Sequence, residues 1–274
     1  MAHTKNRRSH SAAPAVALTV AGSDSSAGAG AQADLKTFTA LGVYGLTAVT
    51  CIVAETPGKV SHIQPADPEI VSEQIDLLLR SFPVSAIKTG LLCNAEIVGQ
   101  VVRRLPKLKD RMLVVDPVMI ATTGDVLLAP EAIEIYEREL FQLATLITPN
   151  LDEAERLTGD PIPDLVAMHR AAKTMAKNYG VAVLLKGGHL RGKRAVDVLC
   201  SGNRIREFSA PFVPHVKTHG TGCTYSAAIT AELAKGVELT HAIAIAKNFV
   251  SAAIRSHFVW ESGRQKVFAL NLSP

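Results

Sequence analysis

Short apolar runs alternate with longer amphipathic stretches along most of the chain, and this alternation constrains the fold more than any other feature of the sequence. From Val16 onward the apolar runs end in Gly, Asp or Pro, and residues at helical spacing follow them. Such a βα rhythm is typical of a largely parallel sheet covered by helices on both faces. The expected fold class is therefore α/β.

The predicted elements follow this rhythm from end to end. Strands are expected over 16–20, 46–53, 86–89, 112–115, 145–148 and 181–185. Helices are expected over 68–81, 96–105, 131–143, 164–178, 224–235 and 241–257, besides one that starts after GSDSSAGAGA and stops at Gly42. Two more β segments, 195–200 and 205–208, flank a Ser-Gly-Asn turn and predict an antiparallel hairpin at one edge of the sheet.

The chain shows no domain boundary and little net charge. Its 274 residues contain no Pro/Ser-rich linker, which predicts a single domain over residues 15–274. The net charge is +4, and Lys5, Arg7 and Arg8 supply nearly all of the excess. Residues 1–14 are therefore expected to form a disordered basic tail, and a nucleic-acid-binding face is disfavoured.

The apolar segment behind this basic tail allows two interpretations. KNRR followed by AAPAVALTVAG resembles a secretory signal, with a basic and then an apolar region. The segment also leads directly into GSDSSAGAGA, which favours a strand that delivers a glycine-rich turn. No apolar run approaches the ~20 residues of a membrane span.

The cysteines indicate a reducing compartment. Cys51, Cys93, Cys200 and Cys223 are scattered without a CxxC pair, so the sequence suggests neither a zinc site nor a disulfide framework. A cytoplasmic location is expected.

Polar or glycine-rich segments follow the predicted strands. In order they are GSDSSAGAGA, AET, KTG, DPVM, TPNLDEAE, KGGH and THGTGCT. Because ligands of such sheets bind beyond the carboxyl ends of the strands, these segments are expected to form one site.

The segment THGTGCT predicts a phosphate site. Gly220 and Gly222 stand beside the hydroxyl residues Thr218 and Thr221 at the start of a helix, where backbone N–H groups converge and the helix dipole favours an anion. No G-K-[ST] follows, so this is not a Walker loop, and the first loop does not match the dinucleotide fingerprint G-x-G-x-x-G. The alternative is that the glycines only form a turn.

Three further loops offer groups for a metal ion and a nucleotide phosphate. Asn150 and Glu153 share a face of one helical turn, which suits Mg²⁺ held through its waters. The same spacing also predicts a capping box, so both interpretations stay open. Asp116, at the end of a buried strand, is a second carboxylate for the metal, and Lys186 is a mobile cation for a nucleotide phosphate.

Taken together, these motifs resemble the ribokinase-like superfamily, and within it the kinases of hydroxymethylpyrimidine, its monophosphate and pyridoxal. The motifs that carry the resemblance are AGSDSSAGAGAQADLKTF, KTG, VVDPVM, TPNLDEAE, KGGH and HGTGCT, spread over about residues 16–258. The resemblance implies a three-layer α/β/α fold with a mostly parallel central sheet, ATP and Mg²⁺ as cofactors, and a homodimer.

The resemblance also assigns roles to residues. Cys223 stands where sugar kinases of the superfamily have a catalytic aspartate, and a thiol at a helix N-terminus is expected to have a lowered pKa and to act as the base. The substrate ring is expected to lie against five residues, namely Gly22, Asp24, Asp34, Glu55 and Val118. Asp34 is expected to accept a hydrogen bond from the alcohol that is phosphorylated.

Three departures from the family pattern bear on specificity. Glu55 occupies the position where most of the pyrimidine kinases have glutamine, and an ionised carboxylate accepts hydrogen bonds without donating any. The segment after DPVM has Ala121 and Thr122 where relatives carry cysteine or lysine, which excludes a two-cysteine relay. The C-terminal segment ESGRQKVFALNLSP also replaces the usual glycine- and histidine-rich ending.

The leading hypothesis is a kinase of hydroxymethylpyrimidine and its phosphate in thiamine diphosphate biosynthesis. A pyridoxal kinase is the closest alternative, because SSAGAG also occurs on that side of the family. A non-catalytic ligand sensor is the alternative from another class, and it is disfavoured because Asn150, Glu153, Lys186 and Cys223 are all retained.

Overall fold

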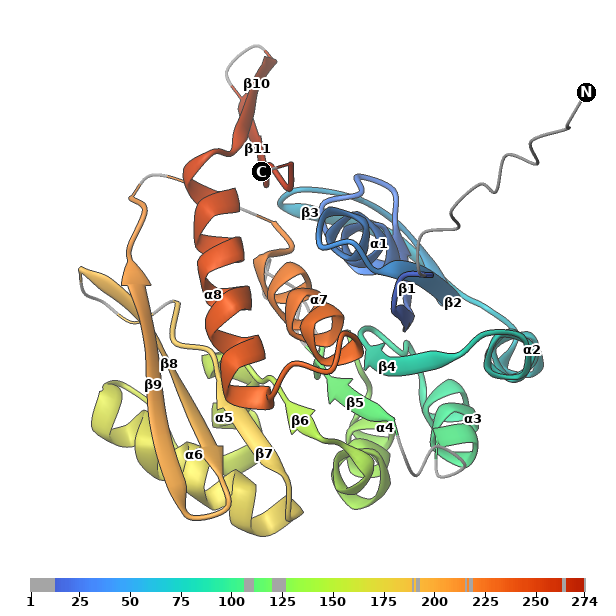
Figure 1. Cartoon of the computed structure of the whole chain (residues 1–274), viewed down its shortest axis with the longest axis horizontal. Coiled ribbons are helices and arrows are strands. Elements are labelled where there is room, and N and C mark those ends of the chain that lie inside the picture. The colour runs from blue at the N-terminus through green and yellow to red at the C-terminus, as the bar shows by residue number, and fades with distance from the viewer. Residues whose placement is uncertain are drawn as a thin grey trace, which may run out of the picture.

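A single large sheet organises the molecule. The computed structural model describes residues 13–105, 111–119, 127–188, 190, 193–214, 216, 219–262 and 265–273. The strands of the sheet are β1 (Val16–Asp24), β2 (Tyr44–Thr56), β3 (Lys59–Pro65), β4 (Val84–Thr89), β5 (Met112–Val115), β6 (Leu146–Ile147), β7 (Ala182–Leu185), β8 (Arg194–Ser201) and β9 (Arg204–Pro211). They lie in the order β3-β2-β1-β4-β5-β6-β7-β8-β9 (Figure 1). From β2 to β7 the neighbouring strands are parallel, whereas β3, β8 and β9 pair antiparallel.

Helices cover both faces of this sheet, as Figure 1 shows. One face carries α1 (Gly30–Ala40), α7 (Thr221–Ala234) and α8 (Leu239–Arg255), and the other carries α2 (Pro68–Ser81), α3 (Ala95–Arg104), α4 (Pro130–Ile135), α5 (Leu151–Thr158) and α6 (Leu165–Tyr179). Side chains of a strand alternate between the faces, so Ala17 packs in the core beneath α7 and Leu18 in the opposite core. The three-layer α/β/α fold is confirmed.

Several elements begin and end where the sequence predicts. Strand β5 and helix α2 have the expected bounds. Helix α2 starts sharply because the Asp67 side chain accepts hydrogen bonds from the N–H groups of Glu69 and Ile70, while Pro68 supplies the first helical residue. The antiparallel hairpin of β8 and β9 lies at one edge of the sheet, as predicted.

Several segments differ from the prediction. Strand β1 continues past Val20 to Asp24, and β3 adds an edge strand that the polar sequence KVSHIQP does not reveal. The single helix expected over 131–143 ends at Ile135 and continues as a π-helical turn (Tyr136–Leu140) and a 3₁₀ turn (Phe141–Leu143). The C-terminal segment forms a separate hairpin of β10 (Phe258–Ser262) and β11 (Gln265–Ala269).

The apolar residues behind the basic tail are part of the core. Val16 to Val20 belong to β1, which lies between β2 and β4, and all five residues are buried. This supports the interpretation of the segment as a strand. The expected tail, residues 1–14, lies mostly outside the described residues.

A buried ion pair ties α8 to the sheet. Lys247 Nζ of α8 lies 2.6 Å from Asp197 Oδ2 of β8, and both residues are buried. The second oxygen of Asp197 accepts a hydrogen bond from the backbone N–H of Gly187, at 3.1 Å. The pair therefore connects the helix with the loop that follows β7.

Replacement of Lys247 by alanine is expected to lower the free energy of unfolding by about 3–5 kcal/mol, because Asp197 would keep a buried charge without its partner. Urea denaturation measures this loss. The matched control is Lys266→Ala, since Lys266 pairs with Glu261 on the exposed hairpin. Its effect is expected to be much smaller, because an exposed ion pair is screened by water. Equal losses in the two variants would show that the buried ion pair stabilises the fold no more than the exposed one does.

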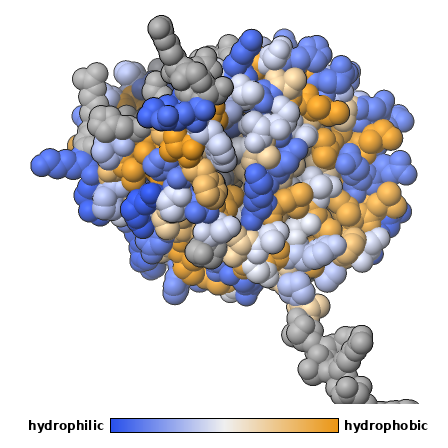
Figure 2. Space-filling view, turned by 90° about the horizontal axis from the view of Figure 1, so that it is seen from above, coloured by the Kyte–Doolittle hydropathy of each residue, from blue (hydrophilic) through white to orange (hydrophobic). Residues whose placement is uncertain are grey.

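No helix among the described residues combines the length and the apolar character that a bilayer crossing requires. On the face shown in Figure 2, hydrophilic and hydrophobic residues are interspersed in small patches.

Candidate active site

The N-terminus of α7 presents backbone N–H groups next to the first glycine-rich loop. Gly220 precedes the helix with a φ of 75°, and no side chain of the described residues caps the helix there. A Cβ atom on Gly220 would collide with the carbonyl oxygen of Gly28, so only glycine allows the two loops to pack. The helix N-terminus keeps the dipole and geometry that suit an anion.

Lys186 places a cation beside this helix N-terminus. Its Nζ atom would lie only 3.1 Å from a Cβ atom on Gly222, and it forms an ion pair of 2.8 Å with Asp116 Oδ1. Burial disfavours the ammonium, but the carboxylates of Asp116 and Glu153 outweigh this effect and raise the pKa of Lys186. The lysine is therefore charged and stands where the sequence predicts a phosphate contact.

Asp116 is buried at the carboxyl end of β5 and is held by three side chains. Besides Lys186, Thr148 Oγ1 donates to Oδ1 and Ser226 Oγ donates to Oδ2, each at 3.0 Å. Burial alone would raise the pKa of Asp116, yet Lys186 and Lys88 lower it. The carboxylate is thus ionised and fixed in place.

Asn150 and Glu153 form the capping box that the sequence allows. Asn150 Oδ1 accepts from the Glu153 N–H at 2.9 Å, and Glu153 Oε2 accepts from the Asn150 N–H at 2.8 Å. Glu153 is buried, and burial together with the negative charge of Asp116 raises its pKa to about 8. Two buried carboxylates close together suit a divalent cation, so the donor set fits Mg²⁺ held through water.

Asp24 organises the first glycine-rich loop. Its carboxylate accepts hydrogen bonds from the N–H groups of Ser26, Gly28 and Ala29 at 2.6–3.1 Å and from the Ser26 hydroxyl at 3.0 Å. His219 Nε2 lies 3.1 Å from the same carboxylate. Burial opposes ionisation, but the hydrogen bonds, that with His219 first, lower the pKa of Asp24 to about 2. Asp24 therefore holds the loop together, and its expected contact with the substrate ring stays a prediction.

His219 links the two loops and is a residue that sequence reasoning missed. Its Nε2 atom lies 3.1 Å from Asp24 Oδ2 and 3.6 Å from Glu55 Oε2. Burial lowers the pKa of His219, but the two carboxylates more than compensate and raise it. The three residues offer donor atoms within 4.8 Å of one another, and both oxygens of Asp24 already accept hydrogen bonds from its own loop. The sequence feature that could have identified His219 is its position directly before Gly220.

Glu55 lies at the end of β2, facing the phosphate loop. Its side chain is mostly buried, and Ser25 fixes its backbone with hydrogen bonds to both the N–H and the carbonyl group. Burial and repulsion by Asp24 raise the pKa of Glu55, whereas His219 lowers it. His219 therefore offsets part of the negative charge of the Glu55 carboxylate.

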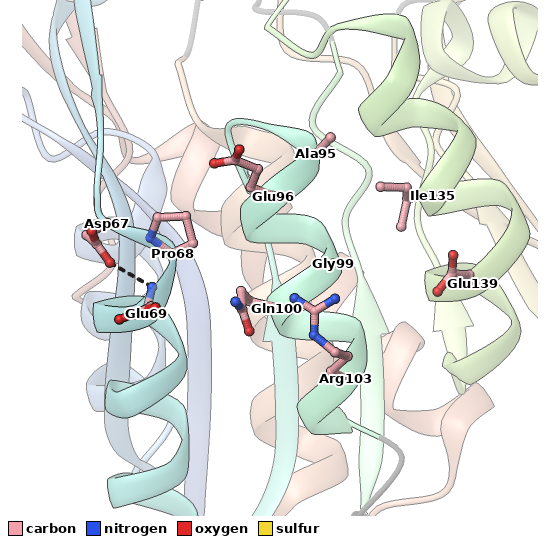
Figure 3. A pocket seen from close by; sticks show the side chains of 10 residues that line it. All are labelled: Asp67, Pro68, Glu69, Ala95, Glu96, Gly99, Gln100, Arg103, Ile135 and Glu139. Atoms are coloured by element: carbon pink, nitrogen blue, oxygen red, sulfur yellow. Dashed lines mark hydrogen bonds between the residues drawn. The ribbon is translucent and has the colours of Figure 1, made fainter.

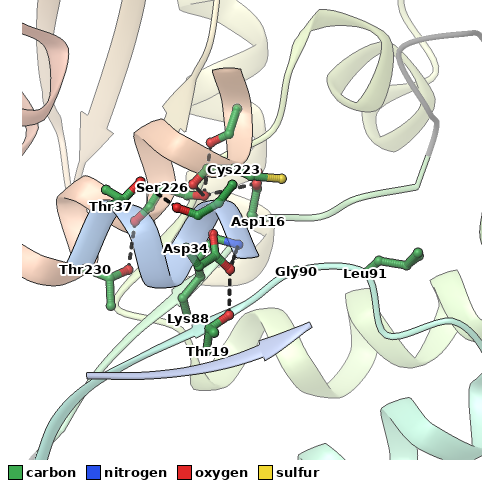
Figure 4. Close-up of polar contacts among 12 residues, drawn as sticks. Thr19, Asp34, Thr37, Lys88, Gly90, Leu91, Asp116, Cys223, Ser226 and Thr230 are labelled. Atoms are coloured by element: carbon green, nitrogen blue, oxygen red, sulfur yellow. Dashed lines mark hydrogen bonds and ion pairs between the residues drawn. The ribbon is translucent and has the colours of Figure 1, made fainter. Parts of the chain in front are cut away.

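Asp34 is buried inside the molecule together with Lys88. Asp34 Oδ2 accepts from Thr19 Oγ1 at 2.6 Å and from Lys88 Nζ at 2.9 Å, and neither charged side chain is exposed (Figure 4). Oδ1 has no hydrogen-bond partner among the described residues. Thr19 and Lys88 engage Oδ2, so the expected contact with the substrate alcohol would be made by Oδ1 and stays a prediction. Lys88 was not singled out from the sequence.

Cys223 sits in the first turn of α7, near Lys88, Asp34 and Asp116 (Figure 4). The prediction of a lowered pKa is wrong. Burial raises the pKa of Cys223 to about 12, and repulsion by the two carboxylates adds to this effect. Lys88 and the backbone N–H of Gly30 oppose the rise without cancelling it. Burial and the nearby carboxylates raise the pKa of the thiol more than the helix N-terminus lowers it, so the thiol keeps its proton at neutral pH.

The remaining predicted site residues are Gly22, Val118, Thr218 and Thr221. Gly22 packs so closely that a Cβ atom would lie 2.7 Å from Cys51 Sγ. Val118 is partly exposed after β5. Thr221 begins α7, whereas Thr218, Ala121 and Thr122 lie outside the described residues.

A surface hollow in the described part of the chain lies away from these residues. It has a volume of about 530 Å³ and lies between α2, α3 and the turn after α4 (Figure 3). Its lining includes Glu69, Glu96, Arg103 and Glu139, and none of the predicted site residues. This hollow is therefore separate from the site that the sequence predicts.

Comparisons with known proteins point to one family of kinases. The sequence model of the family described as phosphomethylpyrimidine kinase matches residues 24–268. The hydroxymethylpyrimidine/phosphomethylpyrimidine kinase of Rhizobium meliloti is 45% identical over 88% of this chain and 90% of its own length. The Pyridoxine kinase of Bacillus subtilis is 42% identical over 88% of this chain and 91% of its own. The chain spans only 49% of the thiamine biosynthesis bifunctional protein ThiED of Geobacter sulfurreducens, to which it is 45% identical.

Solved structures give the same result. An ADP complex of Bacillus subtilis pyridoxal kinase superposes with a TM-score of 0.84 and 38% identity, covering 94% of this chain and 97% of that chain. The phosphomethylpyrimidine kinase from Clostridium difficile 630 has a TM-score of 0.77 and 41% identity, covering 87% and 99%.

Proposed function

Because the chain belongs to the phosphomethylpyrimidine kinase family, we propose that it transfers the terminal phosphate of ATP to 4-amino-5-hydroxymethyl-2-methylpyrimidine and to its monophosphate, in thiamine diphosphate biosynthesis. The observation that carries this proposal is the ammonium of Lys186 beside the N-terminus of α7, with Cys223 in the same turn. A phosphate donor, an acceptor alcohol and a base would meet at this point.

The phosphate-binding part of the site works by charge neutralisation. Backbone N–H groups at the start of α7, around Gly220 and Gly222, and the ammonium of Lys186 would stabilise the negative charge of the transferred group. Asp116 and Glu153 would hold Mg²⁺ through water, and the ion would screen the phosphate oxygens. Asn150 keeps Glu153 in place through the capping box.

Cys223 is the proposed base for the hydroxymethyl proton. In a loose phosphoryl-transfer transition state the proton leaves late, so a strong base that is rarely ionised still contributes. A hydrogen-bond donor on Asp34 Oδ1 would weaken the repulsion that keeps the thiol protonated. Binding of the acceptor and activation of the base would then be coupled.

Substrate recognition is assigned to the first loop and the end of β2. Glu55 would accept hydrogen bonds from the amino group and a protonated nitrogen of the pyrimidine, with His219 holding the carboxylate from the other side. Gly22 and Val118 would pack against the ring.

The variant Glu55→Ala is expected to weaken pyrimidine binding by about 1–3 kcal/mol, because ring donors would stay unpaired in a closed site. Glu55→Gln is expected to be milder, since an amide oxygen still accepts from the amino group. The measurement is KM for hydroxymethylpyrimidine and for ATP in both variants. An unchanged pyrimidine KM in Glu55→Ala, or an equal rise for ATP, would remove Glu55 from the substrate pocket.

A pyridoxal or pyridoxine kinase is the second candidate. It is favoured by the structural match to Bacillus subtilis pyridoxal kinase, which extends over more of this chain than the match to the Clostridium difficile enzyme. The glutamate at position 55 also departs from the pyrimidine pattern.

We also propose that the enzyme is a cytoplasmic homodimer. The free thiols of its four cysteines suit a reducing compartment. Exposed Tyr44 and Ile52 on β2 offer apolar surface near the edge of the sheet for a second copy. Light scattering on the purified chain tests the dimer.

A further inference from the structure

Lys88 is a fully buried lysine with no role in the mechanism described above. Its side chain and that of Asp34 have no exposed surface, and the two are joined by an ion pair of 2.9 Å. Thr19 donates to the same carboxylate oxygen at 2.6 Å. Burying an ammonium is costly, and a surface position would serve a merely structural lysine better. The position of this charge therefore calls for an explanation.

The ammonium of Lys88 lies near Cys223, the proposed base. A Cβ atom on Gly90 would come within 3.2 Å of Nζ, so the glycine of the KTG motif avoids crowding the charge. Figure 4 shows Lys88 and Asp34 near Cys223 and Asp116. Lys88 is also the strongest influence that opposes the effect of burial on the Cys223 pKa.

Charges face the Cys223 thiol from four elements. Asp34 on α1 and Asp116 after β5 disfavour its ionisation, whereas Lys88 on β4 and Lys186 after β7 favour it. Lys186 is committed to Asp116 by an ion pair of 2.8 Å. Among the described residues, Lys88 is therefore the cation that remains to stabilise a thiolate when a substrate donor occupies Asp34.

We propose that Lys88 is a positioning residue that serves the acceptor side of the site in two ways. Its ammonium fixes Asp34 Oδ2 and leaves Oδ1 to accept from the substrate, and it stabilises the thiolate of Cys223. The role toward the substrate rests on the proposed function, whereas the role toward the Cys223 thiolate can be measured without any substrate.

The test is the rate at which iodoacetamide alkylates Cys223 between pH 8 and 10, without ATP or pyrimidine, read by mass spectrometry of the peptide. Cys93 serves as the internal reference in the same protein. Since the thiolate is the reactive form, Lys88→Met is expected to slow alkylation of Cys223 about tenfold. Asp34→Asn is expected to speed it severalfold, because it removes a negative charge and keeps an oxygen acceptor for Lys88. Lys88→Arg keeps the positive charge, so it is expected to slow alkylation less than Lys88→Met does.

Opposite changes in Lys88→Met and Asp34→Asn support the proposal, because loosened packing would expose Cys223 and accelerate alkylation in both. Equal rates in all variants, or acceleration in both, would overturn it. If Lys88→Met does not fold, the pair Asp34→Asn and Lys88→Arg decides: alkylation that is faster in the first variant and not in the second supports the proposal, and any other result overturns it. A chain that phosphorylates no pyrimidine would refute the proposed function and leave this test valid.

Discussion

The variant Cys223→Ser is expected to lose at least ~100-fold in kcat, because a serine hydroxyl is a much weaker proton acceptor than a thiolate. Nucleotide affinity is expected to stay within about twofold, since the N–H groups of α7 and Lys186 remain in place. Steady-state kinetics and calorimetric titration with an ATP analogue measure the two quantities. The exchange of sulfur for oxygen is nearly isosteric, so the fold should not change.

The matched control for this variant is Cys200→Ser. Cys200 is buried in β8, in the edge hairpin, and has no predicted role in the reaction. Its kcat is expected to equal that of the wild type. Wild-type turnover in Cys223→Ser would refute the assignment of Cys223 as the base, and an equal loss in Cys200→Ser would attribute the effect to stability.

The second large effect is expected from Lys186→Met. Removal of this cation is expected to lower kcat/KM for ATP by about 10²–10³-fold, as is typical for groups that neutralise charge in a transition state. The variant also leaves Asp116 without its ion pair, so its thermal unfolding must be measured in parallel. Lys186→Arg keeps the charge and should recover part of the activity.

Lys173→Met is the control for Lys186→Met. Lys173 lies on the exposed side of α6, so its replacement tests only the loss of a surface charge. We expect unchanged kinetics from it. A variant Lys186→Met that folds normally and retains its kcat/KM for ATP would place the phosphate site elsewhere.

The sequence predicted the sheet because its central strands are buried on both faces and carry a strong apolar signal. β3 was missed for the opposite reason: Lys59–Pro65 is an exposed edge strand of mostly polar residues, held by pairing with β2. The hairpin of β10 and β11 likewise exposes Phe258, Val259 and Trp260, so its sequence lacks the alternation of buried and exposed residues that predicts a strand. Elements that depend on pairing alone leave little trace in a sequence.

Contacts within the site likewise differ in how far apart in the sequence the two partners lie. The capping box of Asn150 and Glu153 depends on residues three apart in the chain, and the sequence allowed for it. Lys88 and His219 depend on partners 54 and 195 residues away, Asp34 and Asp24, and no local pattern reveals such pairs. The Cys223 pKa was mispredicted because a helix N-terminus is visible in the sequence, whereas burial and distant carboxylates are not.

The central claim is tested most directly by measuring kcat/KM for hydroxymethylpyrimidine, its monophosphate and pyridoxal side by side, with ATP and Mg²⁺, on the full chain. The account predicts turnover of both pyrimidines, with kcat/KM at least ~10-fold above that for pyridoxal, because a correctly paired polar edge discriminates by ~1–3 kcal/mol. A preference for pyridoxal, or no turnover of any of the three, would contradict it.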